Sequence, residues 1–221
     1  MTRYAIIVAG GTGQRFGSQI PKQFLPLKGL PILMHTINAF HAFDDDMQIV
    51  ITLPPDFFDL WKTLCEQYKF NISHKIVLGG ETRFLSVKSG LDAIGNEGLV
   101  GIHDAVRPLV SRDTLERCFA TAKINGNAIP AVPLNDSIRE LRGNNSVQLN
   151  RDAYVLIQTP QVFEIGLIKH AFKQAYSPEF TDDATVLEKT GKRIILVEGN
   201  RENIKITNQS DMLVAEALLR R

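Results

Sequence analysis

The sequence alternates short apolar runs with stretches of helical spacing, and this alternation constrains the fold more than any other feature. Repeated β-α-β units predict an α/β fold, with a mostly parallel, Rossmann-like sheet and helices on both of its faces. The expected strands are Tyr4–Val8, Gln48–Leu53, His74–Leu78, Leu99–His103 and Ala128–Val132, and the expected helices are Pro31–Ala42, Asp56–Tyr68, Thr82–Ile94 and one that Ser111 caps.

The alternation stops between Leu134 and Phe163, where no helical period is found. Two alternating segments, Ser137–Leu141 and Val147–Asn150, flank a turn signal at 142–145. We therefore predict a β-hairpin arm at about residues 134–160, inserted into a single domain of residues 1–221. Because a lone hairpin is only marginally stable, we expect the arm to pack on something, such as a second subunit. The remaining sequence predicts strands at Val155–Gln158, Arg193–Glu198 and Ile204–Ile206, and helices at Ile165–Gln174, Asp183–Lys189 and Ser210–Arg220.

Composition narrows the class of protein. Hydrophobic residues make up 44% of the chain and charged residues 22%, which excludes wholesale disorder. The net charge of +1 argues against nucleic acid as a partner, because such binding needs a concentrated basic surface. The longest apolar run, Tyr4–Ala9, is too short to cross a membrane and leads into glycines rather than a signal-peptide cleavage site. Two cysteines, Cys65 and Cys118, are too few for a disulfide scaffold. Together with the short apolar run, this predicts a cytoplasmic protein without a membrane partner.

The most informative segment is the glycine-rich loop 9–17 after the first strand, followed by Pro21-Lys22-Gln23. Open α/β sheets bind ligands at the carboxyl ends of their strands, where this loop is expected to lie. Glycines let the backbone approach a phosphate closely, and successive N–H groups can cradle an anion. Arg15 and Lys22 add two positive charges, so the loop predicts a phosphate-binding site. The plain alternative is a glycine-rich turn with charged residues at the surface.

Two common nucleotide-binding motifs do not match this loop. A P-loop ends in Gly-Lys-Ser/Thr, whereas Gly13 is followed by Gln14 and Arg15. A dinucleotide fingerprint needs Gly-x-Gly-x-x-Gly and an acidic residue near the end of the second strand. Here Gly13 and Gly17 are one residue too far apart, and the second strand runs into two prolines. An NAD-dependent oxidoreductase is therefore disfavoured.

Polar residues also follow the third and fourth predicted strands. After the third strand come the glycines of 79–81, Thr82 in a helix-capping position, and Ser86, whose hydroxyl could meet a base edge. Asp104 ends the fourth strand, where a carboxylate is well placed to hold Mg²⁺ beside phosphates. Arg107 could meet an anionic phosphate. The alternatives are a plain loop–helix junction and a structural Asp–Arg ion pair.

Three further features lie near predicted element ends. Lys205 interrupts an otherwise apolar predicted strand, so phosphate is one candidate partner and solvent at a sheet edge is the alternative. His103 ends an apolar strand and is expected to be structural rather than a ligand or base. Thr181-Asp182-Asp183 precedes a predicted helix and is interpreted as an N-cap, with a binding role left open.

Together these segments resemble the 2-C-methyl-D-erythritol 4-phosphate cytidylyltransferase family of the non-mevalonate isoprenoid pathway over nearly the whole chain. The matching segments are Ala9–Arg15, Pro21-Lys22-Gln23, Gly79–Ser86, His103–Pro108, Asp136-Ser137, Arg151, Thr159-Pro160-Gln161, Thr181-Asp182 and Asn203–Thr207. The resemblance implies a fold of the nucleotide-diphospho-sugar transferase type, with Mg²⁺ as cofactor and CTP and a polyol phosphate as substrates. It also implies a homodimer joined through the arm.

The resemblance further implies a role for each matching residue. It assigns CTP binding to Ala9, Gly10, Gly11, Gly13, Gly79, Gly80, Glu81, Ser86 and Ala105. It assigns the metal to Asp104 and stabilisation of the transferring phosphate to Arg15, Lys22 and Lys205. It places Arg107, Ser137, Arg151, Thr159 and Thr181 near the polyol phosphate, with the arm residues contributed by the partner subunit.

The sequence departs from the family pattern at a few positions. Ser137 stands where many relatives have threonine, and Gly10 where alanine is common, and neither change removes a functional group. The sister family, the D-ribitol 5-phosphate cytidylyltransferases, shares the loop and the Thr-Pro-Gln element, so ribitol phosphate is the alternative acceptor. A non-catalytic nucleotide-binding module would keep the loop but could dispense with Asp104, Lys22 and Lys205, all of which are present.

Overall fold

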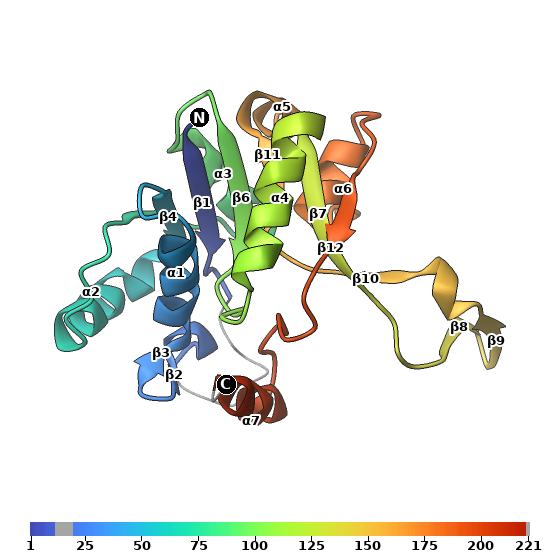
Figure 1. Ribbon diagram of the computed structural model, residues 1–221, viewed down its shortest axis with the longest axis horizontal. Helices are drawn as coiled ribbons and strands as arrows, with labels where there is room; N and C mark the ends of the chain where they lie inside the picture. The colour runs from blue at the N-terminus through green and yellow to red at the C-terminus, as the bar shows by residue number, and fades with distance from the viewer. Residues whose placement is uncertain (12–19, 220–221) are drawn as a thin grey trace.

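The computed structural model describes residues 1–11 and 20–219, and Figure 1 shows an α/β architecture. An eight-stranded sheet has the order β10-β7-β11-β6-β1-β4-β5, with β12 pairing with β7. β1 runs parallel to β4 and β6, and β4 runs parallel to β5, whereas β11 is antiparallel to both β6 and β7. The predicted mostly parallel sheet is confirmed. Its strands are β1 (Arg3–Val8), β4 (Gln48–Leu53), β5 (Lys75–Leu78), β6 (Leu99–Asp104), β7 (Asn127–Pro133), β10 (Val155–Ile157), β11 (Gln161–Glu164) and β12 (Leu196–Glu198).

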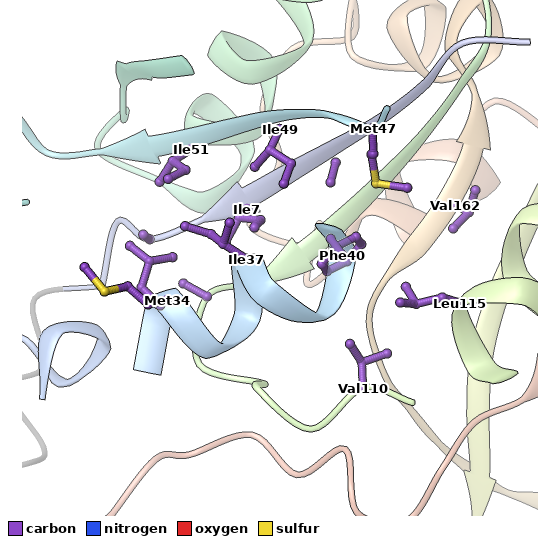
Figure 2. Packing of buried hydrophobic residues seen from close by; sticks show 14 of the residues in the cluster. Ile7, Met34, Ile37, Phe40, Met47, Ile49, Ile51, Val110, Leu115 and Val162 are labelled. Carbon is purple, nitrogen blue, oxygen red and sulfur yellow. The ribbon is translucent and has the colours of Figure 1, made fainter. Parts of the chain in front are cut away.

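Helices cover both faces of the sheet because the side chains of β1 alternate between two apolar cores. Ala5 and Ile7 pack in one core with residues of α1, α2 and α4, and Figure 2 shows Phe40 of α1 within it. Tyr4 and Ile6 pack in the other core with residues of α3, α5 and α6. The helices are α1 (Ile32–Phe43), α2 (Phe58–Gln67), α3 (Arg83–Asp92), α4 (Arg112–Asn125), α5 (Ile165–Ala171), α6 (Asp183–Glu188) and α7 (Gln209–Leu218).

Two helices begin where the sequence predicted their caps. The Thr82 hydroxyl accepts a hydrogen bond from the Leu85 N–H at 3.2 Å, and Ser111 does the same for Thr114 at 3.1 Å. Each cap satisfies a backbone donor that the first helical turn leaves free. Both helices start directly after strand-end loops, so the caps also fix where those loops end.

Several parts of the fold differ from the prediction. β2 (Pro26–Leu27) and β3 (Leu30–Pro31) form a small antiparallel pair that was not predicted. Residues 161–164 form β11, an antiparallel strand between β6 and β7 that the sequence analysis missed. Ile204–Ile206 was predicted as a strand and is not one. Ile206 is fully buried, and its N–H donates to the Val106 carbonyl at 2.9 Å. The apolar pattern there reflects burial of an irregular segment, which periodicity cannot separate from a short buried strand.

The predicted arm is a hairpin of β8 (Ile138–Arg142) and β9 (Asn145–Leu149), paired antiparallel from Ile138↔Leu149 to Arg142↔Asn145. It extends away from the sheet in Figure 1, and the chain returns through β10, which pairs with β7. No helix within residues 1–11 and 20–219 is long and apolar enough to cross a membrane.

Candidate active site

A cavity of about 310 Å³ lies where β1 and β6 end. This is the edge at which an open α/β sheet binds its ligands. The cavity is lined by Val8, Ala9, Gly10, Gly11, Lys22, Gln23, Gly80, Glu81, Thr82, Arg83, Ser86, Asp104, Ala105, Val106 and Lys205. The structure therefore brings together most of the predicted nucleotide, metal and catalytic residues. Gly13 and Arg15 lie outside the described residues.

The first part of the glycine loop is held by Gln23, which follows Lys22 in the short helix Lys22–Phe24. Its buried amide donates to the Ala9 carbonyl at 2.8 Å and to the Gly11 carbonyl at 3.1 Å. With two carbonyls hydrogen-bonded to Gln23, residues 9–11 have a fixed path at the cavity wall. The sequence analysis noted this glutamine within Pro21-Lys22-Gln23 but gave it no role.

The second loop connects β5 to α3 and is fastened at three points. The Gly79 N–H donates to the Leu53 carbonyl at 2.7 Å. The Ser86 hydroxyl accepts from the Gly80 N–H at 3.1 Å and donates to the Thr82 carbonyl at 3.0 Å. Ser86 is 2% exposed, so its hydroxyl both lines the cavity and holds the loop in shape.

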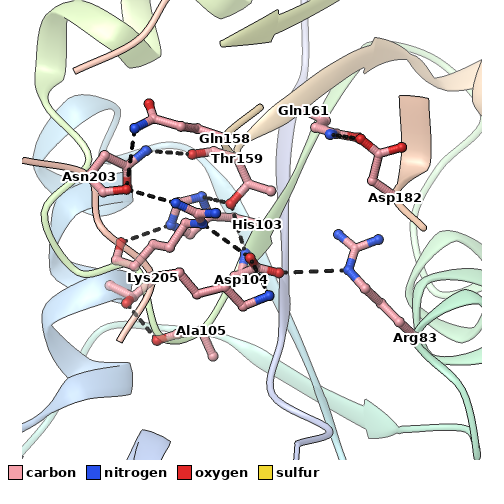
Figure 3. A network of polar contacts seen from close by, with 12 residues as sticks. Arg83, His103, Asp104, Ala105, Gln158, Thr159, Gln161, Asp182, Asn203 and Lys205 are labelled. Carbon is pink, nitrogen blue, oxygen red and sulfur yellow. Dashed lines mark hydrogen bonds and ion pairs between the residues drawn. The ribbon is translucent and has the colours of Figure 1, made fainter. Parts of the chain in front are cut away.

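Asp104, at the end of β6, is surrounded by three cationic side chains, of which Figure 3 labels Arg83 and Lys205. Its Oδ2 lies 3.1 Å from Arg107 Nε and 3.1 Å from Lys205 Nζ, and its Oδ1 lies 3.7 Å from Arg83 Nε. Burial alone would raise the pKa of this carboxyl, but the charges of Arg83, Lys205 and Arg107 outweigh burial and hold the pKa well below its usual range. Asp104 is therefore ionised at neutral pH.

Behind Asp104, His103 and Thr159 form a buried support. The Asp104 N–H donates to the Thr159 hydroxyl at 3.1 Å, and that hydroxyl lies 3.0 Å from Nδ1 of His103. Nε2 of His103 lies 3.0 Å from the Arg107 carbonyl. Burial lowers the pKa of His103 to about 4, so the ring is neutral and structural, as the sequence predicted.

Some predicted substrate residues lie elsewhere or have protein partners. Arg107 donates to the Asn203 carbonyl at 2.8 Å as well as to Asp104, which is the structural ion pair that the sequence left as the alternative. Ser137 and Thr181 are exposed, and neither lines the cavity. Arg151, also exposed, donates to the Asn135 carbonyl at the base of the arm.

The cavity wall also contains Arg83, which the sequence analysis quoted within Gly79–Ser86 without assigning it a role. The signal that could have found it is its position. Arg83 is the first residue of α3, directly after the capping Thr82 of a strand-end loop. A cation at a helix start opposes the helix dipole, so it needs an anionic partner nearby.

The donors at the cavity fit a divalent cation. Mg²⁺ is usually held by one or two carboxylates together with phosphate oxygens and water. Within the described part of the chain, Oδ1 of Asp104 accepts no hydrogen bond, so it could serve as a ligand. Glu81 is the other carboxylate among the described residues that line the cavity.

A glycine-lined cavity at strand ends, with lysines and arginines around one ionised carboxylate, is typical of an α/β enzyme that transfers nucleotidyl groups. The sequence model of the family described as "IspD: 2-C-methyl-D-erythritol 4-phosphate cytidylyltransferase" matches residues 4–221. The chain belongs to this family of cytidylyltransferases.

Individual relatives agree over their full lengths. A 2-C-methyl-D-erythritol 4-phosphate cytidylyltransferase from Bacteroides fragilis is 52% identical over 219 residues, covering 99% of this chain and 100% of its own. One from Bacillus licheniformis is 34% identical over 99% of this chain and 96% of its own. The crystal structure of the Thermus thermophilus enzyme aligns with a TM-score of 0.82 at 31% identity, covering 100% of both chains. The ribitol phosphate alternative and the non-catalytic module are not favoured.

Proposed function

We propose that this chain transfers the cytidylyl group of CTP to 2-C-methyl-D-erythritol 4-phosphate and releases pyrophosphate, for isoprenoid synthesis in the cytoplasm. The observation that carries the proposal is that one cavity is lined by Asp104, by Lys22 and Lys205, and by the glycines of the two loops described above. Relatives named for this reaction, similar over their full length, support the choice of acceptor.

In this reaction an oxygen of the acceptor's phosphate attacks the α-phosphorus of CTP. The bond from that phosphorus to the oxygen bridging to the β-phosphate breaks, and pyrophosphate leaves with the bridging oxygen. A phosphomonoester has a second pKa near ~6, so the acceptor is largely dianionic at neutral pH. No side chain has to remove a proton, and the protein's task is to position two anions and neutralise their charge.

The residues around the cavity supply that charge. Lys22 and Lys205 line it, and the half-exposed Lys205 ammonium, 3.1 Å from Asp104, would meet a phosphate bound in the cavity. Arg15 would add a third cation from the glycine loop. Asp104 would hold Mg²⁺, which neutralises charge on the triphosphate when bound. The backbone of 9–11 and 79–81, with Ser86 and Ala105, would hold the nucleotide.

The acceptor site is proposed to form between two subunits. Four consecutive apolar residues, those of β10 and the one before it, are exposed: Tyr154 by 45%, Val155 by 44%, Leu156 by 55% and Ile157 by 39%. Successive strand residues face opposite sides, so neither side of this segment is covered. A second copy of the chain would cover it and bring Ser137 and Arg151 of the partner subunit toward Arg107, Thr159 and Thr181 of the first subunit.

Pyrophosphate release measured with CTP and Mg²⁺ tests the proposal. 2-C-methyl-D-erythritol 4-phosphate is compared with D-ribitol 5-phosphate, with a reaction lacking acceptor and one with ATP as controls. We expect pyrophosphate release only in the reaction that contains both 2-C-methyl-D-erythritol 4-phosphate and CTP. A preference for ribitol phosphate would move the acceptor to the sister family, and no release with either would refute the proposed reaction.

A further inference from the structure

Arg83 connects Asp104 to a second buried carboxylate, Asp183 at the start of α6. Nη1 and Nη2 of Arg83 donate to Oδ1 and Oδ2 of Asp183 at 2.8 and 2.7 Å. The remaining nitrogen, Nε, points at Oδ1 of Asp104 but stays 3.7 Å away, and Figure 3 shows the two side chains facing each other. That distance is too long for a hydrogen bond. The guanidinium is therefore bound to Asp183 and only adjacent to Asp104.

Asp183 is itself held in place. Gln161, which sequence analysis found in the Thr-Pro-Gln element without assigning it a role, accepts from the Ala184 N–H at 2.8 Å and donates to Asp182 at 2.7 Å. The Asp183 side chain is 1% exposed. Phe84, the residue after Arg83, stacks with Phe172 and with Phe180, whose ring centroids lie 4.7 and 5.6 Å from its own. The start of α3 and the segment 172–184 thus hold each other.

The two oxygens of Asp104 are used differently. Oδ2 is taken by Arg107 and Lys205, and Oδ1 has Arg83 as its neighbour at 3.7 Å. We propose that Asp183 is a positioning residue that binds both terminal nitrogens of Arg83, keeps this guanidinium off Asp104 and so leaves Oδ1 open to a divalent cation. The proposal rests on the proposed function, because the cation site is part of it.

Charge and geometry both support this role. Arginine and carboxylate favour a two-pronged pairing, and Asp183 already supplies it. The nearby Asp182 is engaged by Gln161 and by the Thr185 N–H, so Asp104 is the carboxylate that a released Arg83 would meet. Asp183 occupies both terminal nitrogens of Arg83, whereas a released Arg83 would place its positive charge and its donors on the oxygen that the cation needs.

Binding of Mn²⁺ tests the proposal without turnover, using the electron paramagnetic resonance signal of free Mn²⁺ with CTP present and no acceptor. Asp183→Asn should weaken Mn²⁺ binding about 10-fold, the scale of effect seen when residues supporting a metal ligand are changed. The double variant Asp183→Asn with Arg83→Gln should bind Mn²⁺ within about threefold of the unmodified protein, because the released guanidinium is gone. In turnover, Asp183→Asn should raise the Mg²⁺ requirement while kcat at saturating Mg²⁺ is retained.

A general structural role predicts the opposite order, with the double variant no better than the single one. Equal Mn²⁺ affinity of the two variants would overturn the proposal. If circular dichroism shows that Asp183→Asn does not fold, the Mn²⁺ affinity of the double variant is the test. An affinity about 10-fold weaker than that of the unmodified protein would then contradict the proposal. Glu140→Gln removes another arginine–carboxylate pair, Arg142–Glu140 at 2.8 Å, and should leave Mn²⁺ binding unchanged. Asp104→Asn separates the two proposals, since unchanged Mn²⁺ binding there would refute the cation site itself.

Discussion

Gly80 offers a sharp test of the nucleotide loop, because the structure leaves no room for a side chain there. A Cβ at this position would lie 2.3 Å from Leu85 Cβ and 3.0 Å from the Leu85 carbonyl carbon. Leu85 belongs to the first turn of α3, which cannot give way as the end of a flexible side chain can. Gly80→Ala therefore forces the loop and the helix start apart by about 1 Å.

That displacement acts on the site directly. The Gly80 N–H donates to the Ser86 hydroxyl at 3.1 Å, and both residues line the cavity. A misplacement of about 1 Å can cost ~10²-fold in rate, so we expect kcat/KM for CTP to fall by that order. Forcing a methyl group into a packed site costs about 1–3 kcal/mol of folding free energy, which leaves the protein folded but measurably weaker.

Pyrophosphate release at saturating acceptor and varied CTP measures the first effect, and urea unfolding measures the second. Gly166→Ala is the matched control, since a Cβ there meets Oε1 of the flexible Glu164 side chain at 3.0 Å. Alanine also suits a helix better than glycine by about 1 kcal/mol, so this variant should keep both its kinetics and its stability. A value of kcat/KM for Gly80→Ala within about threefold of the unmodified enzyme would refute the loop's role in holding CTP.

Three further outcomes are expected. Lys205→Met should lower kcat by ~10²–10³ in steady-state assays, because it removes a charge beside the reacting phosphates, and an unchanged kcat would remove Lys205 from the proposed machinery. The free energy of unfolding should fall by about 3 kcal/mol as the pH drops from about 6.5 toward 4. The pKa of histidine is near 6.5 in the unfolded chain, whereas burial lowers the pKa of His103 to about 4, so only the unfolded chain takes up a proton in this range. His103→Gln should flatten that part of the pH profile in urea titrations, and an unaltered slope would assign it to other groups. Leu156→Glu should shift the mass measured by light scattering from dimer to monomer, and a monomeric unmodified protein would disprove the proposed interface.

The sequence was sufficient wherever one strong local signal set the structure. The strand Gln48–Leu53 was predicted to the residue because it is a short, mostly apolar and β-branched segment that ends at Pro54. Thr82 and Ser111 were recognised as caps because their hydroxyls act on donors only three residues away. β11 was missed because it is short, and because its partners β6 and β7 lie far from it along the chain.

The candidate site shows the same limit. Asp104, Lys22 and the cavity-lining glycines Gly10, Gly11 and Gly80 could be picked out from the sequence because each follows a predicted strand and carries recognisable chemistry. Arg83 was overlooked because its two partners, Asp104 and Asp183, come from distant parts of the chain. Which carboxylate an arginine binds depends on the tertiary structure and does not follow from residue type and spacing.

The charges of the site explain how a nearly neutral chain can bring two phosphate-bearing substrates together. The whole protein carries a net charge of +1, from which the sequence analysis expected no nucleic-acid partner. Around Asp104, however, Arg83, Arg107 and Lys205 come from three different segments and meet at one carboxylate. Asp183 binds both terminal nitrogens of the arginine that faces the open oxygen, and Lys22 and Lys205 line the cavity beside it. Local pairing, rather than overall charge, therefore decides which cations are left to meet the substrates.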